Sequence, residues 1–235
     1  MKKVKKFLPI ILFVGLIGVF GYLIFKGDSN PESTEDPASV ELTDQQKQAL
    51  LEGHAKLSEG ANINVVEFGD FQCPACKAAE PEIERILGLY GDQINFYFRH
   101  RPLMSIHPNA KLAAITSEVA ATEDKFWEMH DLLYQRQADW SSLSSTQVID
   151  TFASYGTELG FDTADFRDQI LGETGKGNIN RDDDLAEELE VNGTPTFFVN
   201  GQRLASVSEL EDKIKSLING DSDADKADVS DDSSD

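Results

Sequence analysis

Apolar and polar residues follow several distinct patterns along the chain, and the longest apolar run lies near its beginning. Residues 7–25 are uncharged and mostly apolar, and they follow a basic end, residues 1–6, that holds four lysines. As a helix this run spans roughly 28 Å at about 1.5 Å per residue, which nearly matches a bilayer core of about 30 Å. It is longer than the ~7–15 apolar residues of a cleaved signal peptide, and no Ala-x-Ala-like cleavage site appears before residue 28. We therefore predict an uncleaved transmembrane signal anchor, with a cleaved signal as the alternative.

The N-terminal lysines and two acidic segments complete the predicted organisation. The positive-inside bias keeps residues 1–6 in the cytoplasm, so everything after the anchor of this single-pass membrane protein is expected to be extracytoplasmic. Residues 26–41 are rich in acids, Ser and Pro and predict a solvated acidic linker. Residues 221–235 carry seven Asp and four Ser and predict a disordered acidic tail. The folded domain is thus expected at residues 42–220.

Within residues 42–220 the period of the apolar positions changes from strand to helix and back. Residues 62–68 and 94–98 are short runs of β-branched or aromatic residues and predict buried strands. Between them a helix begins near Cys73, and this order predicts parallel pairing of the two strands with a right-handed crossover. The pattern beyond the second strand predicts a helical insertion at about residues 105–190. Its helices are expected at 111–121, 125–135, 146–159, 163–171 and 182–190.

The last part of the domain predicts a hairpin and a closing helix. Residues 196–199 and 202–205 have strand patterns and flank an Asn-Gly pair, which suits a type I′ turn. Ser208, with Glu211 three residues later, predicts a capping box at the start of the last helix. The fold class is therefore α/β, a sheet frame that carries a helical insertion.

Composition and charge exclude several classes of function. The 235 residues, 40% hydrophobic and 27% charged, suit one folded domain with tails better than a multidomain enzyme. Residues 28–235 carry 16 basic and 42 acidic residues, a net charge of −26, which argues against nucleic acid or anionic lipid as a partner of this part. Only two cysteines occur, so a disulfide-stapled scaffold is excluded and a thiolate zinc site would lack its second ligand pair. The remaining candidate ligands are expected to face solvent or to cap helices, because they are scattered or lack ligand spacing: His54, His100, His107, His130 and the triplet Asp182, Asp183 and Asp184.

The candidate chemistry lies at the first strand-to-helix junction. Cys73-Pro74-Ala75-Cys76 places two thiols on one face of a helix start, with Pro74 at the first helical position, where no N–H is required. Free amides and the positive end of the helix dipole favour the thiolate of Cys73, which is the nucleophile of disulfide exchange. Cys76, one turn into the helix, is expected to be more buried and to resolve a mixed disulfide. A C-x-x-C pair can also bind metal or form a structural loop, but the absence of other cysteines favours a redox role.

These residues together resemble the DsbA-like thiol:disulfide oxidoreductases of the thioredoxin superfamily, including membrane-anchored bacterial members, over about residues 63–217. The resemblance is carried by the segment VVEFGDFQ at 65–72, by Pro81 within the helix, by the long helical insertion, and by the segment VNGTPT at 191–196. It implies a thioredoxin fold in which Pro195 is cis and packs beside the Cys pair. It also implies that the backbone of Thr194 is free to pair with a bound peptide.

Two positions near the Cys pair refine what the resemblance implies. Glu67, six residues before Cys73, matches a buried acid that passes protons to and from the inner cysteine in the family; a strand-edge acid that faces water is the alternative. Ala75 departs from the strongly oxidising enterobacterial members, which have a histidine there that stabilises the thiolate. Because alanine offers neither charge nor donor, we predict a milder oxidant.

The expected reaction is donation of the Cys73–Cys76 disulfide to reduced secreted proteins, with no cofactor. The resemblance implies reoxidation by a membrane quinone-linked thiol oxidase of the DsbB or vitamin K epoxide reductase type. Two alternatives stay open: a membrane-anchored reductase or isomerase that uses the same pair, and a non-catalytic anchored binding module whose Cys pair is a structural clip.

Overall fold

A mixed five-stranded sheet forms the centre of the described part of the protein. The computed structural model describes residues 42–228, with side chains through residue 220. The strands lie in the order β1-β3-β2-β4-β5. β2 and β3 are parallel, as predicted, with Ile63 opposite Ile94, and the other neighbouring strands are antiparallel. The strand bounds are β1 His54–Lys56, β2 Ile63–Gly69, β3 Ile94–His100, β4 Thr196–Val199 and β5 Gln202–Arg203.

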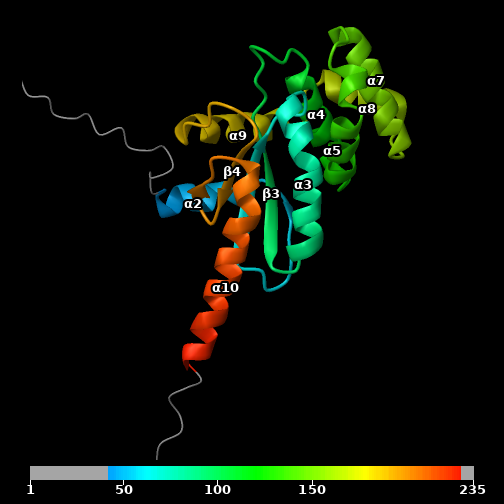
Figure 1. The fold of residues 1–235 in the computed structure, drawn as a ribbon. Coiled ribbons are helices and arrows are strands. Elements are labelled where there is room, and N and C mark those ends of the chain that lie inside the picture. The colour runs from blue at the N-terminus through cyan, green and yellow to red at the C-terminus, as the bar shows by residue number, and fades with distance from the viewer. Residues whose placement is uncertain (1–41, 229–235) are drawn as a thin grey trace, which may run out of the picture. The chain divides into compact units, whose positions relative to one another are not determined.

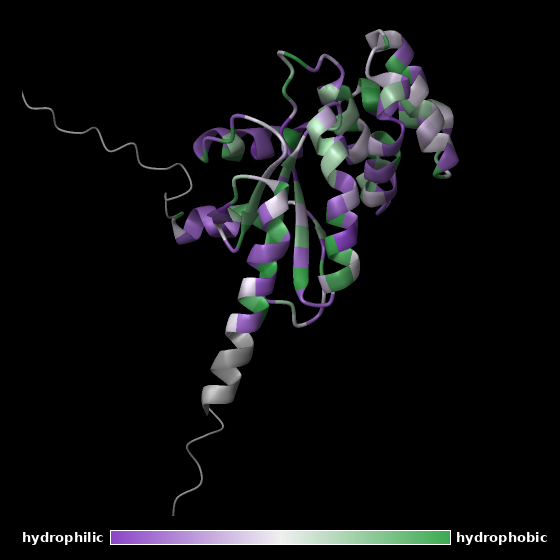
Figure 2. Cartoon of the chain, in the orientation of Figure 1, coloured by the Kyte–Doolittle hydropathy of each residue, from purple (hydrophilic) through white to green (hydrophobic). Residues whose placement is uncertain are grey.

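Helices cover both faces of this sheet because its central strands are apolar on both sides. Helices α3 (Pro74–Tyr90) and α10 (Leu210–Asp228) cover one face, and α2 (Asp44–Leu50) and α9 (Lys176–Glu188) cover the other (Figure 1). Figure 2 shows the apolar residues concentrated on the strands, while α3 and α10 alternate between apolar and polar positions. Each covering helix thus buries one apolar stripe and leaves its polar side outside.

The helical insertion has its own apolar core, and that core reaches the Cys pair. Phe71, Cys73 and Cys76 belong to the same buried cluster as Trp140 and Phe152 of the insertion. The insertion therefore covers the end of the sheet that carries the Cys pair and shields it from solvent. The insertion helices before α9 are α4 Ala110–Ala121, α5 Phe126–Gln135, α6 Gln137–Trp140, α7 Ser145–Glu158 and α8 Thr163–Leu171.

The predicted elements agree with this fold except where local signals were weak or ambiguous. The strands β2 to β4 and the helices α4, α5, α7 and α8 lie within two residues of their predicted bounds. Helix α9 begins at Lys176, six residues before its predicted start. The residue before it, Gly175, has a left-handed backbone (φ 80°), and the apolar periodicity of the sequence does not indicate a helix start at this position. The short elements β1, α2 and α6 were not predicted, since three to seven residues are too few to establish a period.

The closing segment confirms the hairpin but not the capping box. Asn200 (φ 49°) and Gly201 (φ 82°) both lie in the left-handed region, as a type I′ turn requires. Ser208 lies inside a 3₁₀ turn, Val207–Glu209, that precedes α10, so it does not cap that helix. Glu211 instead pairs with Arg85 of α3 and accepts a hydrogen bond from the Tyr90 hydroxyl. The carboxylate of Glu211, which the local pattern assigned to a capping box, thus forms a long-range ion pair instead.

Several predicted segments lie outside the described residues. These are the basic end 1–6, the anchor 7–25, the linker up to residue 41, and residues 229–235 of the tail. Helix α10 continues to Asp228, which is further than the domain end predicted at residue 220. Among residues 42–228, no helix combines the length and apolar character that crossing a bilayer requires.

Candidate active site

The two cysteines lie at the start of α3, directly after the loop that leaves β2. Cys73 is the residue before the helix and Pro74 is its first residue, as predicted. Both thiols are free rather than joined in a disulfide. Cys73 is 6% exposed and Cys76 is fully buried, so only the outer sulfur can meet a large partner. The order of exposure is the one expected for an attacking and a resolving thiol.

The surroundings move the pKa values of the two thiols in opposite directions. A hydrogen bond from the Cys76 thiol lowers the pKa of Cys73 to about 5, against the opposing effect of burial, with help from Thr194 and from the backbone amides of Ala75 and Cys76. Burial raises the pKa of Cys76 well above its ordinary value, and its hydrogen bond to Cys73 adds to this. The outer sulfur is therefore a thiolate at neutral pH and the inner one is a thiol.

The predicted cis-proline loop packs against the outer cysteine. The Thr194–Pro195 peptide bond is cis, which confirms the prediction for Pro195. In its protonated form, the Cys73 Sγ donates a hydrogen bond to the carbonyl oxygen of Thr194 at 3.3 Å. The sequence had separated these two residues by more than a hundred positions, and the antiparallel pairing of β4 with β2 brings them together. Pairing of the Thr194 backbone with a substrate stays a prediction.

Glu67 is buried in the middle of β2 and not at a strand edge. It lies opposite Phe98 of β3 and Phe197 of β4, and neither of its carboxylate oxygens has a hydrogen-bond partner. Burial first, and then the charges of Glu80 and Cys73, raise the pKa of Glu67 well above its ordinary value. The raised pKa favours the protonated carboxyl, which can exchange a proton with a nearby thiol.

A cleft of about 250 Å³ opens between helices α3 and α5. Glu80, Lys77 and Tyr134 are among the residues that line it, on helices α3 and α5. Burial and the neighbouring Asp131 raise the pKa of Glu80 to about 8. Since Glu80 also acts electrostatically on Glu67, the cleft provides a titratable group between the buried acid and solvent.

A network of buried amides and carboxylates holds the loop before Cys73, and sequence reasoning missed it. The side chain of Gln137 donates hydrogen bonds to the carbonyl oxygens of Phe71 and Cys73 at 2.8 and 2.9 Å. Asp70 accepts hydrogen bonds from the backbone amides of Gln72 and Leu103 and contacts His107 at 2.7 Å. In the sequence, only the position of Asp70 and Gln72 next to the Cys pair indicated that they support this loop. Gln137 and His107 gave no such signal, because they lie in the insertion, far from the Cys pair in sequence.

The expectations about candidate ligands were wrong for three histidines and one aspartate. His130 is buried inside α5 and neither faces solvent nor caps a helix. His54 and His100 do not face solvent separately: both ring Nε2 atoms contact the same carboxylate oxygen of Glu118. Asp182 is not part of a solvated helix start, since it is buried inside α9, forms an ion pair with Arg99 at 3.3 Å and accepts the backbone N–H of His100. Pairing of strands and packing of α9 on the sheet create both contacts.

The sheet order, the helices on both faces, the Cys pair at a helix start and the facing cis-proline define a thioredoxin fold with a DsbA-like helical insertion. The family model described as thioredoxin matches residues 53–219, so the chain belongs to the thioredoxin family. The fold resembles that of BdbD from Bacillus subtilis in its oxidised form (TM-score 0.63, 23% identity, 77% of this chain and 95% of that one). It also resembles the thiol-disulfide exchange protein α-DsbA2 from Wolbachia pipientis (TM-score 0.59, 22% identity, 74% of this chain and 92% of that one).

Relatives of higher sequence identity are much longer proteins. The chain is 39% identical over 150 residues to the Na(+)/H(+) antiporter NhaA 3 of Salinispora tropica, a match that covers 64% of this chain and 22% of that protein. It is 32% identical over 206 residues to the Na(+)/H(+) antiporter NhaA 1 of Mycolicibacterium vanbaalenii, covering 86% of this chain and 31% of that protein. The chain thus spans less than a third of the length of these relatives.

Proposed function

We propose that this protein is an extracytoplasmic thiol:disulfide oxidoreductase that donates the Cys73–Cys76 disulfide to secreted or envelope proteins. The observation that carries the proposal is the opposite perturbation of the two thiols at the start of α3. A low pKa at Cys73 stabilises the dithiol form, and a stabilised dithiol makes the disulfide form an oxidant.

The reaction proceeds through two exchanges that balance in electrons. A substrate thiolate attacks Cys73 Sγ of the disulfide, forms a mixed disulfide with it, and expels Cys76 as a thiolate. A second substrate thiolate then attacks the substrate sulfur of the mixed disulfide and expels Cys73. The substrate dithiol loses two electrons, and the Cys73–Cys76 disulfide gains them. Because the pKa of Cys73 is about 5, Cys73 is a good leaving group in this second step.

Glu67 supplies the proton that the first step requires. The expelled Cys76 has a raised pKa and must be protonated, and the Cys76 thiol senses the charge of Glu67. The carboxyl of Glu67 has no competing hydrogen-bond partner within the described residues. Its proton is then replaced from solvent by way of Glu80 and the adjoining cleft.

Turnover requires an electron acceptor outside the domain. The apolar run at residues 7–25 supports anchoring in the cell membrane, with the catalytic domain on the extracytoplasmic side. The resemblance to DsbA-like proteins supports reoxidation by a membrane quinone-linked thiol oxidase of the DsbB or vitamin K epoxide reductase type. Anchoring would confine both proteins to one plane and so raise their encounter frequency.

The test is the redox equilibrium of the full chain in mild detergent against glutathione buffers, read by thiol trapping. We expect a potential between roughly −180 and −100 mV, the range of disulfide donors. A value near −270 mV or below would overturn the proposal in favour of a reductase. If reduction also lowered the unfolding temperature, the pair would be a structural clip in a non-catalytic binding module.

A further inference from the structure

Three potential metal ligands from three different elements meet at one end of the sheet. His54 begins β1, His100 ends β3, and Glu118 belongs to α4. Their Nε2, Nε2 and carboxylate atoms all lie within 4.8 Å of one another. Within residues 42–220 this is the one cluster of His, Cys, Asp or Glu side chains with such spacing.

The two imidazoles converge on a single atom. His54 Nε2 lies 2.6 Å from Glu118 Oε1, and His100 Nε2 lies 2.9 Å from the same oxygen. The other oxygen of Glu118 accepts a hydrogen bond from Asn178 Nδ2 of α9 at 2.6 Å. One carboxylate oxygen thus faces both imidazole nitrogens, while the other is held by an amide that fixes the orientation of the carboxylate.

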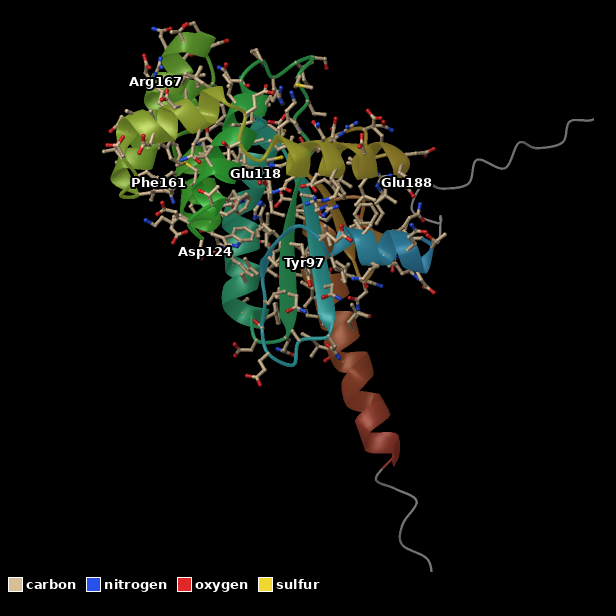
Figure 3. The ribbon with its side chains drawn as sticks, turned by 180° about the vertical axis from the view of Figure 1, so that it is seen from behind. Tyr97, Glu118, Asp124, Phe161, Arg167 and Glu188 are labelled. Carbon is tan, nitrogen blue, oxygen red and sulfur yellow. The ribbon has the colours of Figure 1, made fainter. Side chains whose placement is uncertain are left out.

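Burial and packing preorganise each ligand. The side chains of His100 and Glu118 are almost completely buried, whereas that of His54 is 23% exposed and leaves an approach from solvent. The His54 ring stacks on Phe126 with the ring centroids 3.6 Å apart. Figure 3 shows Glu118 near the beginning of α9 and Glu188 near its end, and at this beginning a Cβ added to Gly175 would lie 2.3 Å from the Cβ of Glu118. Glycine at position 175 therefore lets α9 close over the carboxylate.

The chemistry of this donor set selects the class of ion. Two neutral imidazoles and one carboxylate suit Zn²⁺ and similar first-row divalent ions, which accept His and carboxylate ligands and are often held by three protein groups and one water. Ca²⁺ and Mg²⁺ prefer six or more oxygen ligands, or an octahedron of oxygens, and a site with two ring nitrogens does not offer them.

We propose that His54, His100 and Glu118 bind a divalent transition-metal ion, with Zn²⁺ as the best match, and that the bound ion ties β1 and β3 of the sheet to α4 of the insertion. Asn178 positions Glu118 through its second oxygen. The open coordination position lies on the side of His54, where the site meets solvent. This site is independent of the disulfide chemistry, and it would act on stability because it joins elements from distant parts of the chain.

The experiment uses the full chain in mild detergent with both cysteines replaced, Cys73→Ser and Cys76→Ser, so that thiolates cannot bind the metal. Titration with Zn²⁺ alone, followed by calorimetry and by the unfolding temperature, should give one ion per chain and a rise in that temperature. Titration with Co²⁺ should produce the visible d–d bands of a four- or five-coordinate site with nitrogen and oxygen ligands.

Three variants decide whether these residues form the site. Glu118→Gln keeps the shape of the side chain but removes the charge, and it should weaken Zn²⁺ binding more than roughly 100-fold; Asn178→Ala should weaken it roughly 10-fold, as loss of an orienting partner does. The matched control is Glu158→Gln, an exposed glutamate paired with Arg136, which should leave the affinity unchanged. If His100→Ala fails to fold, the partly exposed His54→Ala gives the decisive measurement.

Several results would overturn the proposal. One is equal Zn²⁺ affinity in Glu118→Gln, His54→Ala and the control, because the metal would then bind to the acidic surface. Another is stronger stabilisation by Ca²⁺ than by Zn²⁺, which would mean an oxygen site. Absence of any saturable binding would leave the three side chains as a purely hydrogen-bonded cluster.

Discussion

The low pKa of Cys73 has a measurable consequence for the stability of the reduced protein. The pKa falls from an ordinary 9.0 to about 5 in the folded chain. A thiol with a lowered folded pKa contributes stability above its unfolded pKa, and this contribution is lost as the pH falls through the folded value. Between pH 5 and pH 9 the contribution grows with pH, because the folded protein releases a proton that the unfolded chain still holds.

The magnitude follows from the position of pH 7 between these two values. The pKa of Cys73 shifts by about four units on folding, and pH 7 lies about two units above the folded value, so about two of these units contribute to stability at this pH. At 1.36 kcal/mol per pKa unit, this contribution is about 2.7 kcal/mol in favour of the folded dithiol form. Because 1.4 kcal/mol corresponds to about 30 mV for a two-electron couple, the disulfide should be more oxidising by about 60 mV than an unperturbed pair. Solvent near the partly accessible sulfur screens the interaction, so both figures are upper limits.

Denaturant unfolding of the reduced and the oxidised full chain at pH 4 and pH 7 measures this contribution. The difference in unfolding free energy between the two forms should shift by up to about 2.7 kcal/mol in favour of the reduced form when the pH rises from 4 to 7. Other titrating groups are present in both forms and largely cancel in the difference. The Cys73→Ser chain is the control, and its unfolding free energy should lack the gain between pH 4 and pH 7 that the titration of Cys73 gives to the reduced protein. A difference that does not change between these pH values, or a thiolate absorbance titration with a midpoint near pH 8, would refute the reasoning.

Three substitutions around the Cys pair test the remaining parts of the site. Glu67→Gln should slow reoxidation and resolution of the mixed disulfide without lowering the unfolding temperature, because it removes a proton carrier and not a hydrogen bond; unchanged exchange rates in stopped-flow measurements would exclude Glu67 from the mechanism. Gln137→Ala should cost about 1–3 kcal/mol in chemical unfolding, because the buried carbonyl oxygen of Phe71 would lose its side-chain donor and that of Cys73 would keep only the backbone N–H of Lys77; a loss below about 0.5 kcal/mol would show that water replaces the amide. Ala75→His should lower the pKa of Cys73 further and raise the redox potential in glutathione buffers, because it adds a charge and a donor beside the thiolate; a potential that stays the same or falls would contradict the account of Ala75.

Much of the fold was predictable because its elements are long and strongly patterned. The strands at 63–69 and 94–100 are apolar on both faces, which is the pattern of a buried parallel pair. The Asn-Gly turn and the helix start at Cys73 depend on neighbouring residues, so local sequence identified both. The prediction of a capping box at Ser208 was wrong because a distant residue decided the outcome: Glu211 forms an ion pair with Arg85 on another helix.

The site was predictable only as far as its residues lie close together in sequence or match a family pattern. Spacing indicated the roles of Cys73 and Cys76, and the resemblance indicated a cis bond before Pro195. No local signal indicated that Gln137 supports the loop before Cys73, or that His54 and His100 share an oxygen of Glu118. These contacts join residues that are 18 to 64 positions apart and come from different elements.

By itself the sequence determined the order of strands and helices, the position of the thiol pair at a helix start, and the acidic character of the domain. These properties depend on the period of apolar residues, on turn and cap chemistry, and on summed charge, all of which are local or additive. The tertiary structure alone decided the burial of Glu67, the contact of Thr194 with Cys73, and the meeting of the two histidines with Glu118. Each of these depends on strand register and on helix packing, which bring distant residues together to within a few ångströms and set the environment that shifts their chemistry.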